Sequence, residues 1–238
     1  MTRETYGVST ATWAFRSLSR SHRVRLATGI GFVFHLLSTV TLISLSGRRD
    51  IAGFVYLTGF IPIAILATVT QGNLFGVDRG STLTAFATPV CAKTFCRVKL
   101  VVALLWTLGT LLTGLVAGLT VIGLRFVPVA LLQIAFAFLL CAVGGMLSVF
   151  APSSRAYART TAQTMSVTTL VPLNVVSLLG IGGASKLLTS VNEIDIQVIL
   201  ASACMLTALL MEIASIVFIG NLFESRRDHI MDALRENP

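Results

Sequence analysis

The stretch that decides the fold is LVVALLWTLGTLLTGLVAGLTVI, residues 100–122, which is apolar almost throughout and holds no charged side chain. A helix needs about 20 consecutive, mainly apolar residues to cross the hydrocarbon core of a bilayer. Five further stretches approach or exceed this length, at residues 26–45, 51–71, 126–150, 165–183 and 198–219. The sequence therefore predicts an all-α integral membrane protein with six transmembrane helices.

The composition agrees with a membrane protein. Hydrophobic residues make up 55% of the chain, charged residues only 12%, and the mean hydropathy is +0.86. A soluble domain carries about 25% charged residues. The 238 residues have room for one membrane domain over 26–220, flanked by cytoplasmic segments at 1–25 and 221–238. Because the segment before the first span is longer than a secretory leader, we expect the N-terminus to be retained.

The distribution of positive charge predicts the topology. With six spans, both termini lie on one side, and all but four of the 18 Lys and Arg residues fall on that side. The four exceptions are Arg48, Arg49, Arg125 and Lys186. The positive-inside rule then places both termini in the cytoplasm. The net charge of +8 fits this topology and contact with anionic lipid better than nucleic-acid binding.

Residues 9–25 are predicted to form an amphipathic helix on the membrane surface. One helical face is apolar, with Ala11, Ala14, Phe15 and Leu18, and another is cationic, with Arg16, Arg20 and Arg23. Two interpretations stay open. The segment is either a basic flank that orients the first span or a helix that also contacts a partner.

The segment between residues 71 and 99 is predicted to be the longest cytoplasmic loop. Asp78 or Ser81 suits the N-cap of a short helix that runs towards Thr88, and Pro89 would end it. Such a helix offers side chains to a docking partner, whereas the alternative is a simple turn. Cys91 and Cys96 also lie in this polar loop, but their spacing matches no zinc pattern, so we expect no metal site.

Two ionisable residues lie within the predicted spans: His35 in the first and Glu212 in the sixth. Charges at membrane depth are costly, so both should face protein or a wet cavity. Each is either a substrate contact or proton site, or a hydrogen-bonded pin between helices. We favour the pin, because the spans hold no other charged group, and Asn174 is open to the same two interpretations.

Gly180, Gly182 and Gly183 are predicted to interrupt the fifth span. The semi-polar stretch that follows, up to Asp195, favours short re-entrant pieces. A plain extracellular loop is the alternative.

Two short motifs resemble those of the ABC-2 type transporter permeases. The first follows the second span and comprises Asn73, Phe75, Gly76, Asp78, Arg79 and Gly80, with Pro89 and Lys99 downstream. The second is GGMLSVFAP, residues 144–152, which is similar to the end of the fourth span in that family. The six-span layout and the basic N-terminal helix also resemble the family.

This resemblance implies the permease subunit of an ABC exporter in a bacterial cytoplasmic membrane, without enzymatic activity of its own. The chain lacks the phosphate-binding loop of an ATPase, so ATP and Mg²⁺ would bind a separate subunit. A second permease chain would complete the transport path. The cargo would be hydrophobic or amphipathic, such as a drug, a lipid-like molecule or a small peptide.

The resemblance also implies roles for individual residues. Contacts that receive the ATP-driven movement would come from Phe75, Gly76, Asp78, Arg79, Gly80, Leu83, Phe86, Arg16 and Arg20. The substrate path would include His35, Glu212 and Asn174. The outer gate would include Gly180, Gly182 and Gly183.

Two other functions stay open. One is a proton-coupled secondary transporter that uses His35 and Glu212, although residues 26–122 and 126–219 show no convincing repeat. The other is a membrane immunity protein that binds an antimicrobial agent without moving it. A membrane enzyme is not expected, because no catalytic set of carboxylate, His or Ser residues gathers at one place.

Overall fold

The computed structural model describes residues 3–45, 59–71, 74, 82–83, 92–150 and 167–235. The structure is all-helical, with 96% helix and, in these ranges, no strand. Its elements in chain order are α1 (Arg3–Arg20), α2 (His22–Leu45), α4 (Phe60–Gln71), α6 (Ala92–Ile122), η2 (Gly123–Phe126), α7 (Val127–Phe150), α8 (Val167–Ser190), α9 (Ile194–Ser225) and α10 (Arg227–Arg235).

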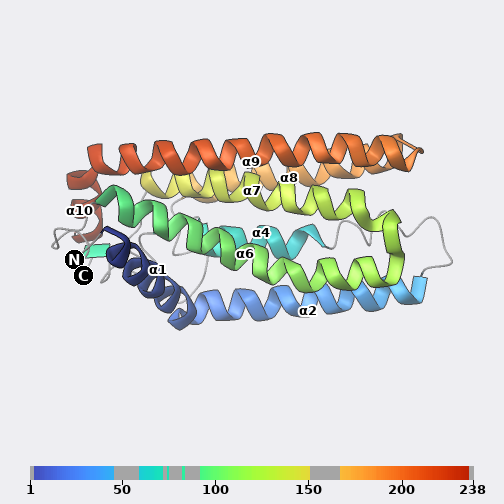
Figure 1. The fold of residues 1–238 in the computed structure, drawn as a ribbon, viewed down its shortest axis with the longest axis horizontal. Helices are drawn as coiled ribbons and strands as arrows, with labels where there is room; N and C mark the ends of the chain where they lie inside the picture. The colour runs from blue at the N-terminus through green and yellow to red at the C-terminus, as the bar shows by residue number, and fades with distance from the viewer. Residues whose placement is uncertain are drawn as a thin grey trace.

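The longer helices run side by side along the long axis of the molecule, and α1 and α10 lie together at one end (Figure 1). At the other end, η2 reverses the chain between α6 and α7, where Gly123 has a positive φ of 71° that suits glycine. The turn from α8 to α9 is closed by the Gln197 side chain. Its Nε2 donates to the carbonyl oxygens of Val191, at 2.6 Å, and Leu188, at 3.1 Å.

Three helical segments are long and apolar enough to cross a membrane: Lys93–Phe150, which comprises most of α6 together with η2 and α7, then Leu170–Ser190 and Ile194–Ser225. Two shorter apolar helices, Val24–Phe34 and Phe60–Gln71, lie within α2 and α4. The expectation of an all-α protein with membrane-spanning character is therefore confirmed. That the chain crosses the membrane six times remains a prediction.

The centre of the bundle is α7, which packs against α4, α6, α8 and α9, and most extensively against α9. The periphery is apolar too: Leu178 and Leu179 on α8 are each 71% exposed, and Leu210 on α9 is 66% exposed. In water, so much exposed apolar surface favours aggregation, whereas in lipid it faces a compatible solvent. This distribution suits a bundle whose outer face contacts lipid or another membrane chain.

The predicted interruption of the fifth span is wrong, because α8 continues through all three glycines to Ser190. A Cβ atom on Gly180 would lie 2.7 Å from Cε2 of Phe136, so this glycine lets α8 approach the ring on α7 closely. A Cβ atom on Gly182 or Gly183 would meet nothing within 4 Å. Glycine costs a helix only about 1 kcal/mol relative to alanine, which packing easily outweighs.

Two predicted boundaries also need correction. The helix expected over residues 9–25 ends at Arg20, and α2 begins at His22, because the Ser21 hydroxyl accepts a hydrogen bond from the Val24 amide at 3.5 Å and caps the new helix. The polar loop expected up to residue 99 ends before Ala92, so Cys96 lies buried in α6. The described part of the segment from residue 221 is mostly helical, comprising the end of α9 and α10.

Gly180→Ala should destabilise the bundle, because the new methyl group would collide with the Phe136 ring, and overpacking of this kind costs about 1–3 kcal/mol. Gly182→Ala is the matched control on the exposed face of the same helix and should leave stability unchanged or raise it slightly. Thermal unfolding in detergent measures both. Equal melting temperatures for the two variants would contradict the close approach of α7 and α8.

Candidate functional site

The end of the bundle that bears α1 and α10 contains one continuous apolar core, which we call the end cluster. It includes buried side chains from every α-helix named above except α8: Leu18 of α1, Val24 of α2, Leu66 of α4, Leu100 of α6, Val149 of α7, Phe223 of α9 and Ile230 of α10. Leu74, between α4 and α6, is buried in it as well. A displacement of any one element at this end therefore presses on the others, since a packed core deforms little.

The helix α1 joins the end cluster through one face. Ala14 and Leu18 are almost fully buried, and the Trp13 ring lies 5.4 Å from the ring of Phe95 on α6. Two of the residues predicted to contact a partner, Arg16 and Arg20, are exposed. The structure thus separates an inward apolar face of α1 from a cationic face that is free to meet another molecule.

A second connection at this end runs through Thr82 and Leu83. The Lys99 side chain of α6 is only 1% exposed, and its Nζ donates to Oγ1 of Thr82 at 3.3 Å. Leu83 packs against the end cluster. This short segment is therefore fixed to α6 from the side of the predicted cytoplasmic loop.

Most of the residues predicted to couple the chain to an ATPase lie outside the described residues: Phe75, Gly76, Asp78, Arg79, Gly80 and Phe86. Leu83 is the described member of that segment. The burial of Lys99 was not expected, since the sequence pattern presented it as a flanking charge in a loop.

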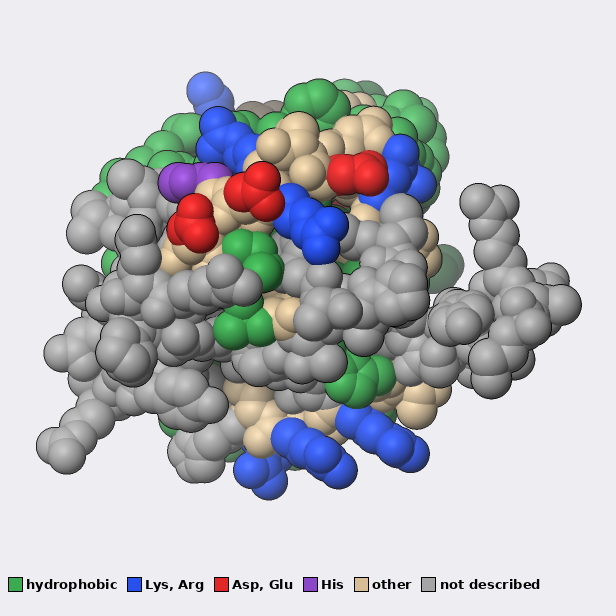
Figure 2. All heavy atoms as spheres, turned by 90° about the vertical axis from the view of Figure 1, so that its left-hand side faces the viewer, with side chains coloured by type: hydrophobic (Ala, Val, Ile, Leu, Met, Phe, Trp, Pro, Cys, Tyr) green, Lys and Arg blue, Asp and Glu red, His purple; other side chains and the backbone are tan. Residues whose placement is uncertain are grey.

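Charged side chains of both signs gather on this end face of the molecule (Figure 2). Arg97 and Arg226 also link helices there. Nη2 of Arg97 donates to the carbonyl oxygen of Val217 on α9 at 3.2 Å, and the Arg226 guanidinium lies 4.7 Å from the centre of the Phe150 ring. At the opposite end, the described cations are Arg125 of η2 and Lys186 of α8.

A group of polar side chains lies in the interior of the bundle, away from the end face. It consists of Gln71, Thr107, Cys141 and Glu212, from α4, α6, α7 and α9, and we call it the interior polar cluster. Thr107 and Gln71 lie beside the Cys141 thiol, and Glu212 is close enough to interact with it electrostatically. Four helices therefore place their polar groups around one point.

The hydrogen bonding of this cluster is incomplete. Among the described residues, neither carboxylate oxygen of Glu212 has a hydrogen-bond partner, although the side chain is buried. Nearby, the Ser215 hydroxyl donates to the Ala142 carbonyl oxygen at 3.2 Å. In the described part of the chain, the hydrogen bond between helices that the sequence suggested for Glu212 is made by Ser215.

The substrate path predicted from His35, Glu212 and Asn174 stays a prediction. Glu212 is buried in α9, whereas Asn174 is exposed on α8. His35 lies in α2, and its side chain is outside the described residues. The described residues also include no group of three or more His, Cys, Asp or Glu side chains that suits a metal ion.

Two cavities lie between the described helices. The smaller, of about 290 Å³, lies between α4, α7, α8 and α9 and is lined mainly by apolar side chains. Phe60 and Phe136 form an edge-to-face pair in its wall, with ring centres 5.4 Å apart. Gly180 and Gly183 line this cavity, and the outer gate predicted from them stays a prediction.

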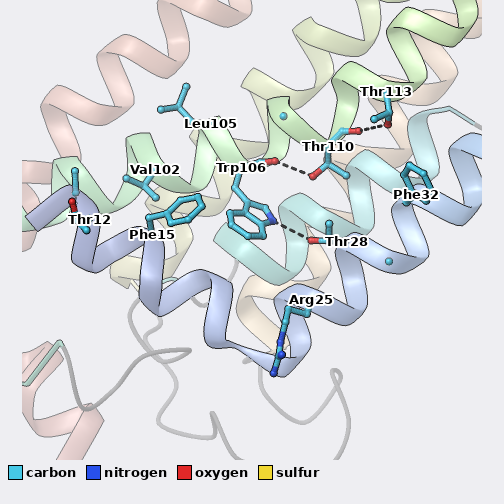
Figure 3. Close-up of a pocket in the computed structure, with 13 residues that line it drawn as sticks. Thr12, Phe15, Arg25, Thr28, Phe32, Val102, Leu105, Trp106, Thr110 and Thr113 are labelled. Atoms are coloured by element: carbon cyan, nitrogen blue, oxygen red, sulfur yellow. Dashed lines mark hydrogen bonds between the residues drawn. The ribbon is translucent and has the colours of Figure 1, made fainter.

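The larger cavity, of about 1010 Å³, is an open groove between α1, α2 and α6 (Figure 3). Phe15 and Trp106 meet there with ring centres 5.3 Å apart. Nε1 of Trp106 donates to Oγ1 of Thr28 at 3.0 Å, so the indole is held by α2. Arg25 supplies the charged group of the lining. The sequence offered no sign of this groove, because its walls come from helices far apart in the chain.

Glu212→Gln should leave the melting temperature unchanged or raise it. The carboxylate has no described hydrogen bond to lose, and a neutral amide of similar shape avoids the cost of burying a charge. Glu212→Ala should lower the melting temperature, because it leaves a cavity between α7 and α9. If Glu212→Gln proves as damaging as Glu212→Ala, the charge of the carboxylate supports the fold through a partner.

Comparison with known proteins adds no family assignment. No protein-family model, no curated protein and no solved structure matches this chain.

Proposed function

We propose that this chain is the membrane subunit of an ABC exporter in a bacterial cytoplasmic membrane. It crosses the membrane six times, with both termini in the cytoplasm, and pairs with a second permease chain. A separate ATPase subunit, which carries ATP and Mg²⁺, docks at the end that bears α1 and α10. The cargo is hydrophobic or amphipathic.

The end cluster is the observation that carries this proposal. It joins α1, whose other face exposes Arg16 and Arg20, to the apolar helices through buried side chains such as Leu18 and Leu100. The Lys99–Thr82 hydrogen bond attaches a second segment at the same end. A subunit that moves α1 or this segment would transmit its movement into the bundle, because packed interfaces shift between discrete arrangements rather than deform continuously.

The arrangement of helices supports the proposed topology. The helices α1 and α10 lie at the same end (Figure 1), which is the arrangement expected of a chain with an even number of spans. Most of the described cations, including Lys93, Arg97 and Arg227, belong to helix termini at this end. The positive-inside rule makes it the cytoplasmic end.

The smaller cavity, between α4, α7, α8 and α9, supports an apolar cargo. Its wall contains the Phe60–Phe136 pair and aliphatic side chains, and its described lining holds no charged residue. Binding sites for small molecules are commonly of this kind, since burial of apolar surface supplies most of the affinity. Movement of α8 against α7 would change the size of this cavity, because Gly180 and Phe136 are in close contact.

The interior polar cluster favours a second candidate, a proton-coupled carrier. A buried carboxylate with no described hydrogen-bond partner suits a site that gains and loses a proton. Transport distinguishes the two candidates: Glu212→Gln removes the proton site, so retained transport favours the exporter and abolished transport favours the carrier.

Charge reversal on α1 should weaken docking of the ATPase. Tagged chain is isolated in mild detergent, and ATP hydrolysis by the co-purifying proteins is measured. Arg16→Glu with Arg20→Glu should lower the recovered activity about tenfold, because the reversed charges no longer complement the docking surface of the ATPase. A tenfold loss of affinity corresponds to about 1.4 kcal/mol. The matched control, Arg125→Glu at the opposite end, should recover full activity.

Two results would contradict this proposal. One is wild-type chain that brings down no ATPase under any mild condition. The other is an equal loss of activity in the α1 variant and in Arg125→Glu, which would mean that the location of the charge does not matter.

A further inference from the structure

The groove between α1, α2 and α6 combines an apolar wall with a single type of charge. Phe15, Phe32 and Leu105 line it and remain 53%, 47% and 60% exposed, so no described residue covers them. Its volume, about 1010 Å³, reaches the upper end of the range for small-molecule sites, about 300–1,000 Å³. The described lining holds Arg25 and no acidic residue.

The polar groups on α2 and α6 in this groove are already satisfied. Thr28 donates to the Val24 carbonyl oxygen at 2.7 Å, Thr110 to that of Trp106 at 2.9 Å, and Thr113 to that of Thr110 at 3.0 Å. The Trp106 indole donates to Thr28 (Figure 3). The wall that α2 and α6 form therefore offers methyl groups and aromatic rings to a bound molecule, rather than free hydrogen-bond donors.

Arg25 differs from those groups. It is exposed at the junction of α1 and α2, and its Nη2 makes one long hydrogen bond, 3.5 Å, to the Arg20 carbonyl oxygen. A guanidinium has five N–H donors in a planar fork that matches a phosphate group. Most of the N–H donors of Arg25 have no described partner, so an anionic group can bind at the junction of α1 and α2.

The groove thus runs from a cationic junction at the charged end of the bundle into the apolar length of α2 and α6. An occupant with an anionic head and apolar tails matches both parts. A membrane supplies such molecules at this level, and aromatic side chains such as Phe15 and Trp106 are typical of the boundary between headgroups and acyl chains. Cationic residues beside a membrane surface attract anionic lipid in particular.

We propose that this groove binds one anionic glycerophospholipid, with its phosphate at Arg25 and its acyl chains against Phe15, Phe32, Leu105 and Trp106. The site anchors α1 to α2 and α6 from the lipid side. It requires only that these helices lie in a membrane, and it does not depend on the proposed exporter function.

Quenching of Trp106 fluorescence tests this site directly. The chain contains two tryptophans, so Trp13→Phe leaves Trp106 as the single fluorescent reporter, inside the groove. The protein is reconstituted into phosphatidylcholine vesicles that contain a small fraction of either phosphatidylglycerol or phosphatidylcholine with brominated acyl chains. Brominated phosphatidylglycerol should occupy the site about fivefold more readily, the preference expected from one cation beside an anionic headgroup.

Three further variants locate the effect. Arg25→Gln should abolish the preference for phosphatidylglycerol, while Arg16→Gln, which removes an exposed α1 cation outside the groove lining, should retain it. Gly109→Leu should block access of both lipids, because a side chain there extends into the groove and a Cβ atom meets nothing within 4 Å. It keeps the test decisive even if Arg25→Gln fails to fold.

Three outcomes would overturn the proposal. Equal quenching by the two brominated lipids means that the groove does not select an anionic headgroup. An equal loss of preference in Arg25→Gln and Arg16→Gln assigns the effect to overall surface charge. Weak quenching by both lipids in the parent protein means that another protein or a second copy of the chain covers the groove.

Discussion

The packing of α7 against its neighbours is the interaction on which the rest of the structure depends. It is possible because α7 carries small side chains where other helices cross it. A Cβ atom on Gly145 would lie 2.7 Å from Leu100 and 3.2 Å from Ile219, so α6 and α9 both approach the α7 backbone there. In a membrane, where apolar surface alone gives helices little reason to associate, such close contact between small residues stabilises the bundle. The smaller cavity, the interior polar cluster and the end cluster all include residues of this central helix.

The end cluster and the interior polar cluster are connected through the same helices. On α9, Phe223 and Ile219 belong to the end cluster, and Ser215 and Glu212 follow deeper in the bundle. On α6, Leu100 is followed in the same way by Thr107. Helices are stiff, so a shift imposed at the charged end reaches the buried polar groups without any change of secondary structure. A carboxylate without a described partner is sensitive to such a shift, because small movements decide which groups can solvate it.

Hydropathy was sufficient to predict the fold class and the position of most helices, since α2, α7 and α9 each overlap a predicted span closely. It was wrong about Gly180, because a sequence pattern shows the low helix propensity of glycine but not the Phe136 ring that makes glycine necessary. It could not predict the burial of Lys99 or the grouping of Gln71, Thr107 and Cys141 around Glu212. Those features depend on contacts between helices that lie far apart in the sequence. The predicted partner contacts of Arg16 and Arg20 remain predictions, although both residues are exposed.

Measuring which energy source drives transport is the most direct test of the proposed exporter function. The chain would be reconstituted into vesicles with and without the ATPase that co-purifies with it, and accumulation of a fluorescent amphipathic dye would be followed under two driving forces. We expect accumulation that needs both the ATPase and ATP, and that persists after the proton gradient is collapsed. Accumulation by the chain alone, driven by a pH difference and lost in Glu212→Gln, would contradict the exporter and establish a proton-coupled carrier.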